Sequence, residues 1–282
     1  MKIKILILCL FLYSCSSDDE TTIITGEGVF ATLSEGAIIE GELFLPEGEG
    51  VFPVMIIVPG SANEPRETSS HPLIKIINDS GYGVYVYDKR GIGGSTGSYP
   101  TETPTTVTEF LTARAEDVLG IIDLLKTHTQ IDPERIGVFG SSQGAWVNSI
   151  VHSKSTDLSF IVMSSCGVAS VGLSDFYNDL TDGDPNLSID DAMLQLVNFN
   201  GPDGFDPLDI IESMSLPVLW IFGNDDRSHP VRYDAEVLEN LDKSNFTTLL
   251  FSNADHDLID VTTGQQPPDL ISSVTAWLDE NN

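Results

Sequence analysis

Apolar positions along this chain follow two patterns that alternate, short continuous runs and longer segments in which apolar residues recur at helical spacing. Short, mostly apolar runs are typical of strands buried on both faces, and they occur at residues 54–58, 84–87, 135–139, 160–163, 218–222 and 247–251. Apolar residues at helical spacing lie between or after these runs, at residues 72–77, 111–125, 145–152 and 270–278. Strands that alternate with helices predict an α/β fold, with a mostly parallel sheet covered by helices on both faces.

Two segments depart from this alternation. Residues 28–45 contain short apolar runs separated by Ser34, Glu35 and Gly36, which predicts a β-hairpin ahead of the main sheet. The stretch between residues 163 and 218 is longer than a single crossover helix requires, and it is rich in Asp, Asn and Gly. We therefore expect a small inserted cap over the active-site edge, at about residues 168–214.

A possible calcium loop lies within this insertion. Asp182, Asp184 and Asn186 have the spacing of the first three ligands of such a loop. Leu187 replaces the glycine that the loop requires, and Met193 replaces its final glutamate. An acidic, solvated loop is the favoured interpretation, with a weak calcium site as the alternative.

The N-terminal segment has the pattern of a secretory signal. Lys2 and Lys4 precede an apolar run, residues 5–12, which is shorter than the roughly 20 residues that span a membrane. The Leu-Tyr-Ser-Cys sequence ending at Cys15 resembles the lipobox of bacterial lipoproteins, which implies cleavage after residue 14 and lipidation of Cys15. Residues 15–24 then form a polar tether, and residues 25–282 one domain. A plain signal peptide with a stray cysteine is the alternative.

Charge restricts the partners. The chain has 13 Lys and Arg against 43 Asp and Glu, a formal net charge of −30, so its surface repels nucleic acid and anionic lipid. The membrane is therefore expected to be contacted only through the lipid on Cys15, which places the protein at the bacterial cell envelope, with the outer membrane as the expected site. Of the three cysteines, Cys9 leaves with the signal and Cys166 stands alone, so no disulfide framework is expected.

The strongest chemical signal is the pentapeptide Gly-Ser-Ser-Gln-Gly at residues 140–144. It follows a predicted strand and precedes a predicted helix, which is the setting of a nucleophile elbow. This setting makes Ser142 the candidate nucleophile. It also places the backbone N–H of Gln143 in the first helical turn, where donors favour an anion. The alternative is an ordinary turn between a strand and a helix.

A serine nucleophile needs a histidine base and a carboxylate that orients it. In a parallel sheet these groups gather at the carboxyl ends of the strands. His256 follows the last strand at this edge and is the favoured base. His229 lies at the same edge but only three residues beyond the candidate carboxylates, Asp225 and Asp226. Both of these aspartates follow the strand at residues 218–222, and sequence physics alone leaves the choice between them open.

The other three histidines fit less well. His128 precedes its strand, and His152 lies ten residues along the helix after the nucleophile. His71 precedes a helix, and nothing in the sequence directs it inward.

A glycine-rich stretch at residues 91–97 also follows a predicted strand. It imitates a dinucleotide-binding fingerprint, but Thr96 occupies the place of the third glycine, and Tyr99 and Pro100 continue a loop where a helix should begin. The glycines are therefore interpreted as loop geometry.

These motifs together resemble the α/β-hydrolase superfamily, in particular its esterase and serine-aminopeptidase-like group. The matching stretches lie at residues 58–61, 87–95 and 140–144. The acid motif of that group fits Gly223, Asp226 and Pro230, so the resemblance selects Asp226, and His256 matches the base.

The resemblance further implies an oxyanion hole formed by the N–H groups of Ser61 and Gln143. Pro59 stands where the group usually has histidine, which leaves Ala62 as a possible substitute donor. The implied function is hydrolysis of a small carboxylic ester through an acyl-enzyme, with no cofactor and no metal. A serine peptidase or aminopeptidase of the same fold, and a non-catalytic binding lipoprotein, are the alternatives.

Overall fold

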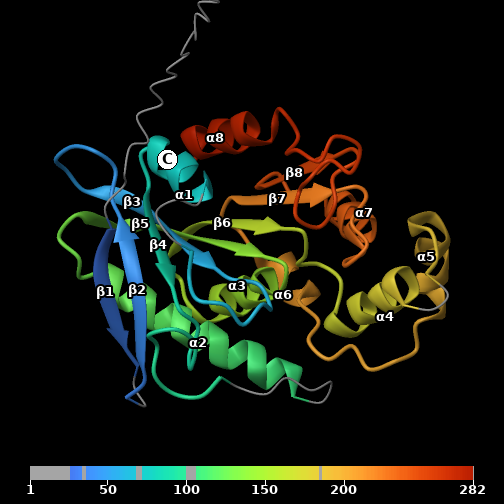
Figure 1. Ribbon diagram of the computed structural model, residues 1–282, viewed down its shortest axis with the longest axis horizontal. Coiled ribbons are helices and arrows are strands. Elements are labelled where there is room, and N and C mark those ends of the chain that lie inside the picture. Colours follow the sequence, from blue (N-terminus) through green and yellow to red (C-terminus); the bar gives the residue numbers. More distant parts are fainter. Residues whose placement is uncertain (1–25, 34–35, 68–71, 100–105, 184–185, 282) are drawn as a thin grey trace, which may run out of the picture.

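A single sheet forms the centre of the protein. The computed structural model describes residues 26–33, 36–67, 72–99, 106–183 and 186–281. Within these residues eight strands run in the order β1-β2-β4-β3-β5-β6-β7-β8 (Figure 1). Their bounds are β1 Gly26–Thr32, β2 Ile38–Phe44, β3 Phe52–Val58, β4 Gly83–Tyr87, β5 Ile131–Ser141, β6 Leu158–Ser164, β7 Val218–Gly223 and β8 Phe246–Phe251.

The first two strands form an antiparallel hairpin, and β2 also pairs antiparallel with β4. All remaining pairs are parallel. Because parallel strands are buried on both faces, their sequences lack alternation, as in β7, whose six residues are all buried. The α/β fold expected from the sequence, with its leading hairpin, is confirmed.

Helices cover both faces of the sheet (Figure 1). The helices α1 (Pro72–Asp79) and α8 (Leu270–Glu280) pack on one face. The helices α2 (Val107–Leu125), α3 (Gln143–Lys154) and α7 (Val231–Leu241) contribute to the core on the other face. Helix α7 was not predicted from the sequence, because its apolar stripe of Val231, Ala235 and Leu238 is interrupted by acidic residues.

The segment between β6 and β7 contains α4 (Val171–Asp182), α5 (Ile189–Gln195), the 3-10 helix η1 (Leu196–Asn198) and α6 (Leu208–Ser213). Figure 1 shows α4 and α5 beyond the carboxyl ends of the parallel strands, at the right of the view. In contrast, Ile211 of α6 is fully buried in the core that α2 and α3 share. The insertion therefore combines a projecting part with a part of the core. None of the helices in the described residues is long and apolar enough to cross a membrane.

Candidate active site

The turn from β5 into α3 holds Ser142 in a strained conformation. Its backbone angles are φ 52° and ψ −130°, a region that non-glycine residues rarely occupy and that costs of order 1–3 kcal/mol. The two flanking glycines are required by close packing. A Cβ on Gly140 would lie 2.4 Å from the carbonyl oxygen of Gly144, and one on Gly144 would lie 2.3 Å from that of Val58. The strand, turn and helix expected for a nucleophile elbow are all present.

Asp226 and His256 lie together at the same edge of the sheet. Nδ1 of His256 is 2.8 Å from Oδ2 of Asp226, whose side chain is fully buried. The other carboxylate oxygen, Oδ1, accepts the backbone N–H groups of Ser228 and His229 at 2.7 and 2.9 Å. Because a carboxylate accepts but does not donate, the imidazole proton resides on Nδ1. Nε2 of His256 is then the atom able to accept a proton.

The neighbouring aspartate is placed differently. The side chain of Asp225 is 31% exposed and lies 3.5 Å from the guanidinium of Arg232. The structure therefore brings Asp226, and not Asp225, to His256. The backbone of this loop is also held by the cap, because the hydroxyl of Tyr177 in α4 donates to the carbonyl of Asp226 at 2.8 Å.

His229, the alternative base, belongs to a separate buried cluster. Its Nδ1 is 2.7 Å from Oγ of Ser174 in α4, and its Nε2 is 2.8 Å from Oδ2 of Asp234 in α7. Asp234 also accepts the backbone N–H groups of Val168 and Ala169. This cluster ties the cap, the loop after β6 and the loop after β7 together, so His229 is fixed in the interior with both ring nitrogens in contact with partners.

The remaining histidines lie away from this edge or outside the described residues. His128 precedes β5 and lies 3.7 Å from a carboxylate oxygen of Glu27. His152 lies in the last turn of α3. His71 and the proposed lipidation site Cys15 are outside the described residues.

The loop after β3 passes beside the nucleophile. A Cβ on Gly60 would lie 3.4 Å from Cβ of Ser142, which places the predicted oxyanion loop next to the elbow. Ser61 is the next residue and is exposed. The buried ammonium of Lys89 bonds to the carbonyls of Gly60 and Ser61 at 3.1 and 3.3 Å, and also to that of Ala62. Burial, and then the charge of Arg114, lower the pKa of Lys89 to about 8.

Arg114 links both sides of the predicted oxyanion hole. From α2, its buried guanidinium donates to Oε1 of Gln143 and to the carbonyl of Pro59. One rigid group thus holds the start of α3 and the start of the loop that carries Ser61 at a fixed separation. The sequence indicated no role for Arg114, and none for Lys89 although it lies in the matching stretch 87–95, because only the fold brings both side chains to the elbow.

We expect Arg114→Met to lower kcat by about tenfold to a hundredfold with little change in KM, since a misplaced oxyanion hole weakens binding of the transition state and not of the substrate. Steady-state kinetics on a small ester measure both constants. Arg90→Met is the matched control, because Arg90 follows β4 and its guanidinium also bonds to α2, through Asp117. Equal losses in both variants, or a rise in KM alone, would contradict a positioning role for Arg114.

The charges around His256 affect its protonation. Burial lowers the pKa of its imidazole, but the hydrogen bond and charge of Asp226, followed by the charges of Asp257 and Asp255, outweigh burial, so the pKa lies above its ordinary value of 6.5. A base must be neutral to accept a proton. If His256 is the base, we therefore expect the acid limb of hydrolysis on the alkaline side of pH 6.5.

We expect kcat/KM to rise with pH through a midpoint above 6.5, as His256 becomes neutral. It should fall again near pH 8, because Lys89 then loses the charge with which its ammonium holds the carbonyls of Gly60 and Ser61. Asp257→Asn removes one of the charges that raise the pKa of His256, so the acid limb should move to lower pH. Glu280→Gln, at the end of α8, is the control and should leave the limb in place. An acid limb below pH 6.5, or one that Asp257→Asn leaves unchanged, would contradict this explanation.

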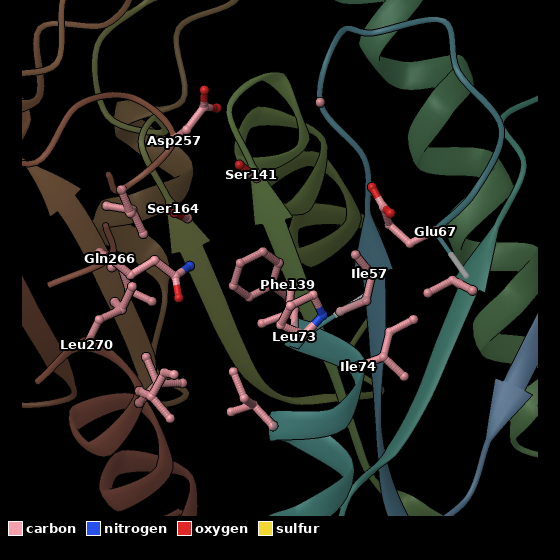
Figure 2. Close-up of a pocket in the computed structure, with 18 of the residues that line it drawn as sticks. Ile57, Glu67, Leu73, Ile74, Phe139, Ser141, Ser164, Asp257, Gln266 and Leu270 are labelled. Atoms are coloured by element: carbon pink, nitrogen blue, oxygen red, sulfur yellow. The ribbon is translucent and has the colours of Figure 1, made fainter. Parts of the chain in front are cut away.

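A cavity of about 490 Å³ reaches the site from the face of the sheet covered by α1 and α8 (Figure 2). Gly60, Ser141 and His256 are among its lining residues. No described residue of the insertion between β6 and β7 lines it. The cavity that reaches His256 is lined by the sheet, α1, α8 and described residues of the loops before those helices, and the covering of the active-site edge by the insertion stays a prediction.

The possible calcium loop contains an arginine side chain. The guanidinium of Arg227 lies 3.4 Å from Oδ1 of Asp182 and also donates to Oδ1 of Asn186. Asp184 lies outside the described residues. Among the residues that the structure describes, no group of three or more acidic, His or Cys side chains could hold a metal ion.

The glycine-rich loop after β4 closes on Asp88. Oδ2 of Asp88 accepts the backbone N–H of Gly94 at 2.8 Å, and a Cβ on Gly93 would lie 2.3 Å from that oxygen. Gly91 and Gly97 have positive φ angles of 73° and 90°. Close packing and backbone conformation therefore account for the glycines of this loop.

Comparison with known proteins adds the family. Residues 69–282 match the prolyl oligopeptidase family, and this stretch contains Ser142, Asp226 and His256. The chain belongs to this family. The matched stretch begins after Ser61, so the family does not bear on the predicted oxyanion loop.

Two curated proteins are related to the chain over much of its length. It is 23% identical over 272 residues to the uncharacterized peptidase YuxL of Bacillus subtilis (strain 168), covering 93% of this chain and 40% of the relative. It is 26% identical over 197 residues to protein ABHD12B of Homo sapiens, covering 66% of this chain and 49% of the relative. The chain thus spans less than half the length of these relatives.

Among solved structures, an esterase of Pyrococcus furiosus superposes with a TM-score of 0.69 and 21% identity, covering 91% of each chain. At this identity the similarity concerns the fold. Family and fold together confirm the resemblance to the α/β-hydrolase superfamily and support a hydrolase.

Proposed function

We propose that this protein is a serine hydrolase that cleaves carboxylic esters through an acyl-enzyme on Ser142. His256 takes the proton from Oγ of Ser142 as this oxygen attacks the ester carbonyl, and the N–H groups of Ser61 and Gln143 stabilise the oxyanion. The intermediate collapses, and His256 returns the proton to the departing alcohol. A water molecule, deprotonated by His256, then attacks the acyl group and releases the carboxylic acid together with the free Ser142.

One observation carries the assignment. The imidazole of His256 is bound through Nδ1 to a buried carboxylate, that of Asp226, at the sheet edge where Ser142 has a strained backbone. The carboxylate fixes the tautomer and stabilises the imidazolium that forms during attack. A protein that only binds a ligand has no need for this arrangement.

Charge favours an ester without a negative group. The net charge of −30 repels anions, and no Lys or Arg is among the described residues that line the cavity. The arginines nearest the cap are paired with acidic residues, Arg227 with Asp182 and Arg232 with Asp190. We therefore propose an uncharged or cationic ester as the substrate.

The family match favours a serine peptidase as the second candidate. An amide leaving group is poorer than an alcohol and depends more strongly on protonation by His256. The experiment compares kcat/KM for three substrates with a common acyl part: a short ester, its carboxylate-bearing analogue and an aminoacyl amide. The proposal expects the neutral ester to be fastest. A preference for the amide would favour the peptidase, and a preference for the anionic ester would contradict the electrostatic argument.

The lipid anchor is a separate proposal that rests on the sequence alone. Cleavage before Cys15 and acylation of its side chain would hold the enzyme at the cell envelope, through a polar tether that ends near residue 24. Cys15→Ser should then move the protein from the membrane fraction to the soluble fraction without changing its specific activity, as measured by fractionation and ester turnover. Retention in the membrane fraction would show that another surface provides the attachment.

A further inference from the structure

The cavity beside His256 exposes the middle of the sheet. Its floor includes Ile57 of β3, Phe139 of β5 and Ile221 of β7. Strands of a parallel sheet are normally covered on both faces, yet Ile57 and Phe139 are only partly buried. Exposed apolar surface of this kind is stabilised when an apolar ligand covers it.

The two helices on this face form the walls. Leu73, Ile74 and Ile76 of α1 face Leu270, Ile271 and Val274 of α8 across the cavity. Figure 2 shows the side chains of Leu73, Ile74 and Leu270 at one end of the cavity, while Ser141 and Asp257 lie at the other. The end away from the elbow is therefore aliphatic, Phe139 and the amide of Gln266 lie between the two ends, and Ser141 and Asp257 lie at the end next to the elbow.

This polar end is where an acyl group would be attached. Gly60 and Ser141 line the cavity, and both lie directly beside Ser142. His256 lines it as well. Ser142 itself is not among the lining residues, but an acyl group bonded to its Oγ lies between Gly60, Ser141 and His256, at this end of the cavity.

Charge at the mouth excludes a free acid as the preferred ligand. Among the described lining residues the charged ones are Glu67 and Asp257, together with His256, and none of them is a Lys or Arg that could pair with a carboxylate. A neutral ester enters without repulsion. The carboxylate product is repelled after hydrolysis, which favours its release.

The cap offers a second hollow, of about 260 Å³, which is lined by Val107, Phe176 and Phe199 among others. None of Ser142, Asp226 and His256 lines it. A chain bound there would not be held at the reacting atoms, so the cavity between α1 and α8 is the better site.

We propose that the cavity between α1 and α8 binds the aliphatic acyl chain of the ester substrate, an inference that rests on the proposed function. Its volume lies within the range of about 300–1,000 Å³ that is usual for small-molecule sites. The substrate class is then an ester of a medium-length aliphatic acid, and the selectivity for chain length lies in the two helices and not in the cap.

The test measures kcat/KM along two ester series. The first lengthens the acyl part from acetate through butyrate to octanoate with a constant alcohol, and the second lengthens the alcohol with a constant acetate. We expect a rise of about fourfold for each added methylene in the acyl series until the cavity is filled, and little change in the alcohol series. A flat acyl series, or a rise confined to the alcohol series, would overturn the proposal.

Filling the cavity supplies the second arm. Leu73→Trp and Ile271→Trp place a larger side chain on opposite walls of the cavity. Each should lower the ratio of octanoate to acetate turnover by tenfold or more, which is the loss expected when about two methylenes of the acyl chain no longer fit. Leu194→Trp in the cap is the matched control, because Leu194 is 72% exposed and does not line the cavity. An equal loss in the control, or an unchanged ratio in both wall variants, would contradict the assignment.

A binding measurement separates this proposal from the proposed function. Methyl octanoate is titrated calorimetrically into Ser142→Ala, which retains the cavity but lacks the nucleophile. If methyl octanoate binds to Ser142→Ala, and adding Leu73→Trp to this variant weakens the binding, the cavity is supported as an acyl site. This result holds even if wild-type protein hydrolyses no ester and the proposed function fails. Absence of binding overturns the acyl site, whether or not wild-type protein cleaves acetate.

Discussion

Ser142→Ala should abolish ester turnover, with a loss of about four to six orders of magnitude in kcat. Without Oγ no acyl-enzyme forms, and the remaining oxyanion donors alone accelerate hydrolysis only weakly. The fold should persist, because the strained turn is held by Gly140, Gly144 and the backbone bond from the N–H of Ser142 to the carbonyl of Ser164. Turnover of a short ester and the thermal unfolding midpoint measure the two effects.

Ser141→Ala is the matched control for this variant. It removes the neighbouring hydroxyl, one residue before the nucleophile in β5, and should leave most of the activity in place. If Ser141→Ala were inactive and Ser142→Ala retained the full rate, the assignment of the elbow would be wrong.

Asp226→Asn should lower kcat by about four orders of magnitude. An amide in place of the carboxylate would favour the wrong tautomer of His256 and leave its imidazolium without a counter-charge. The change also replaces one oxygen of a side chain that accepts the N–H groups of Ser228 and His229. Circular dichroism should therefore accompany the kinetics, to show that the variant is folded.

Asp225→Asn provides the comparison. The Asp225 side chain is partly exposed and lies beside Arg232, away from His256, so we expect at most a few-fold change. Similar and mild losses in both variants would mean that the orienting acid lies elsewhere in the chain.

Much of the architecture was predictable because it follows from local patterns. The apolar runs that became β3 to β8 and the strand-turn-helix around Ser142 depend on residues close together in the chain. Helix α7 was missed because acidic residues interrupt its apolar stripe. The cap helices were missed because residues 164–217 have weak periodicity, although Ser170 and Ser188 cap α4 and α5 as N-cap residues do.

The chemistry of the site was predictable only in part. Position after a strand indicated Ser142, His256 and two equivalent aspartates, but sequence physics alone could not separate Asp225 from Asp226. The pairing of His256 with Asp226 depends on contacts across thirty residues, and the bridge from Arg114 to Pro59 depends on contacts across fifty-five. Long-range contacts of this kind leave no local trace. For the same reason nothing in the sequence indicated that α1 and α8 leave Ile57 and Phe139 accessible.

The central claim, that Ser142 is an activated nucleophile, is tested most directly by fluorophosphonate labelling followed by peptide mass spectrometry. An activated serine reacts covalently with this probe, whereas an ordinary hydroxyl does not. The account predicts a single adduct on Ser142, absent from Ser142→Ala and formed much more slowly in Asp226→Asn. No adduct on the folded wild-type protein, or an adduct on another serine that persists in Ser142→Ala, would contradict it.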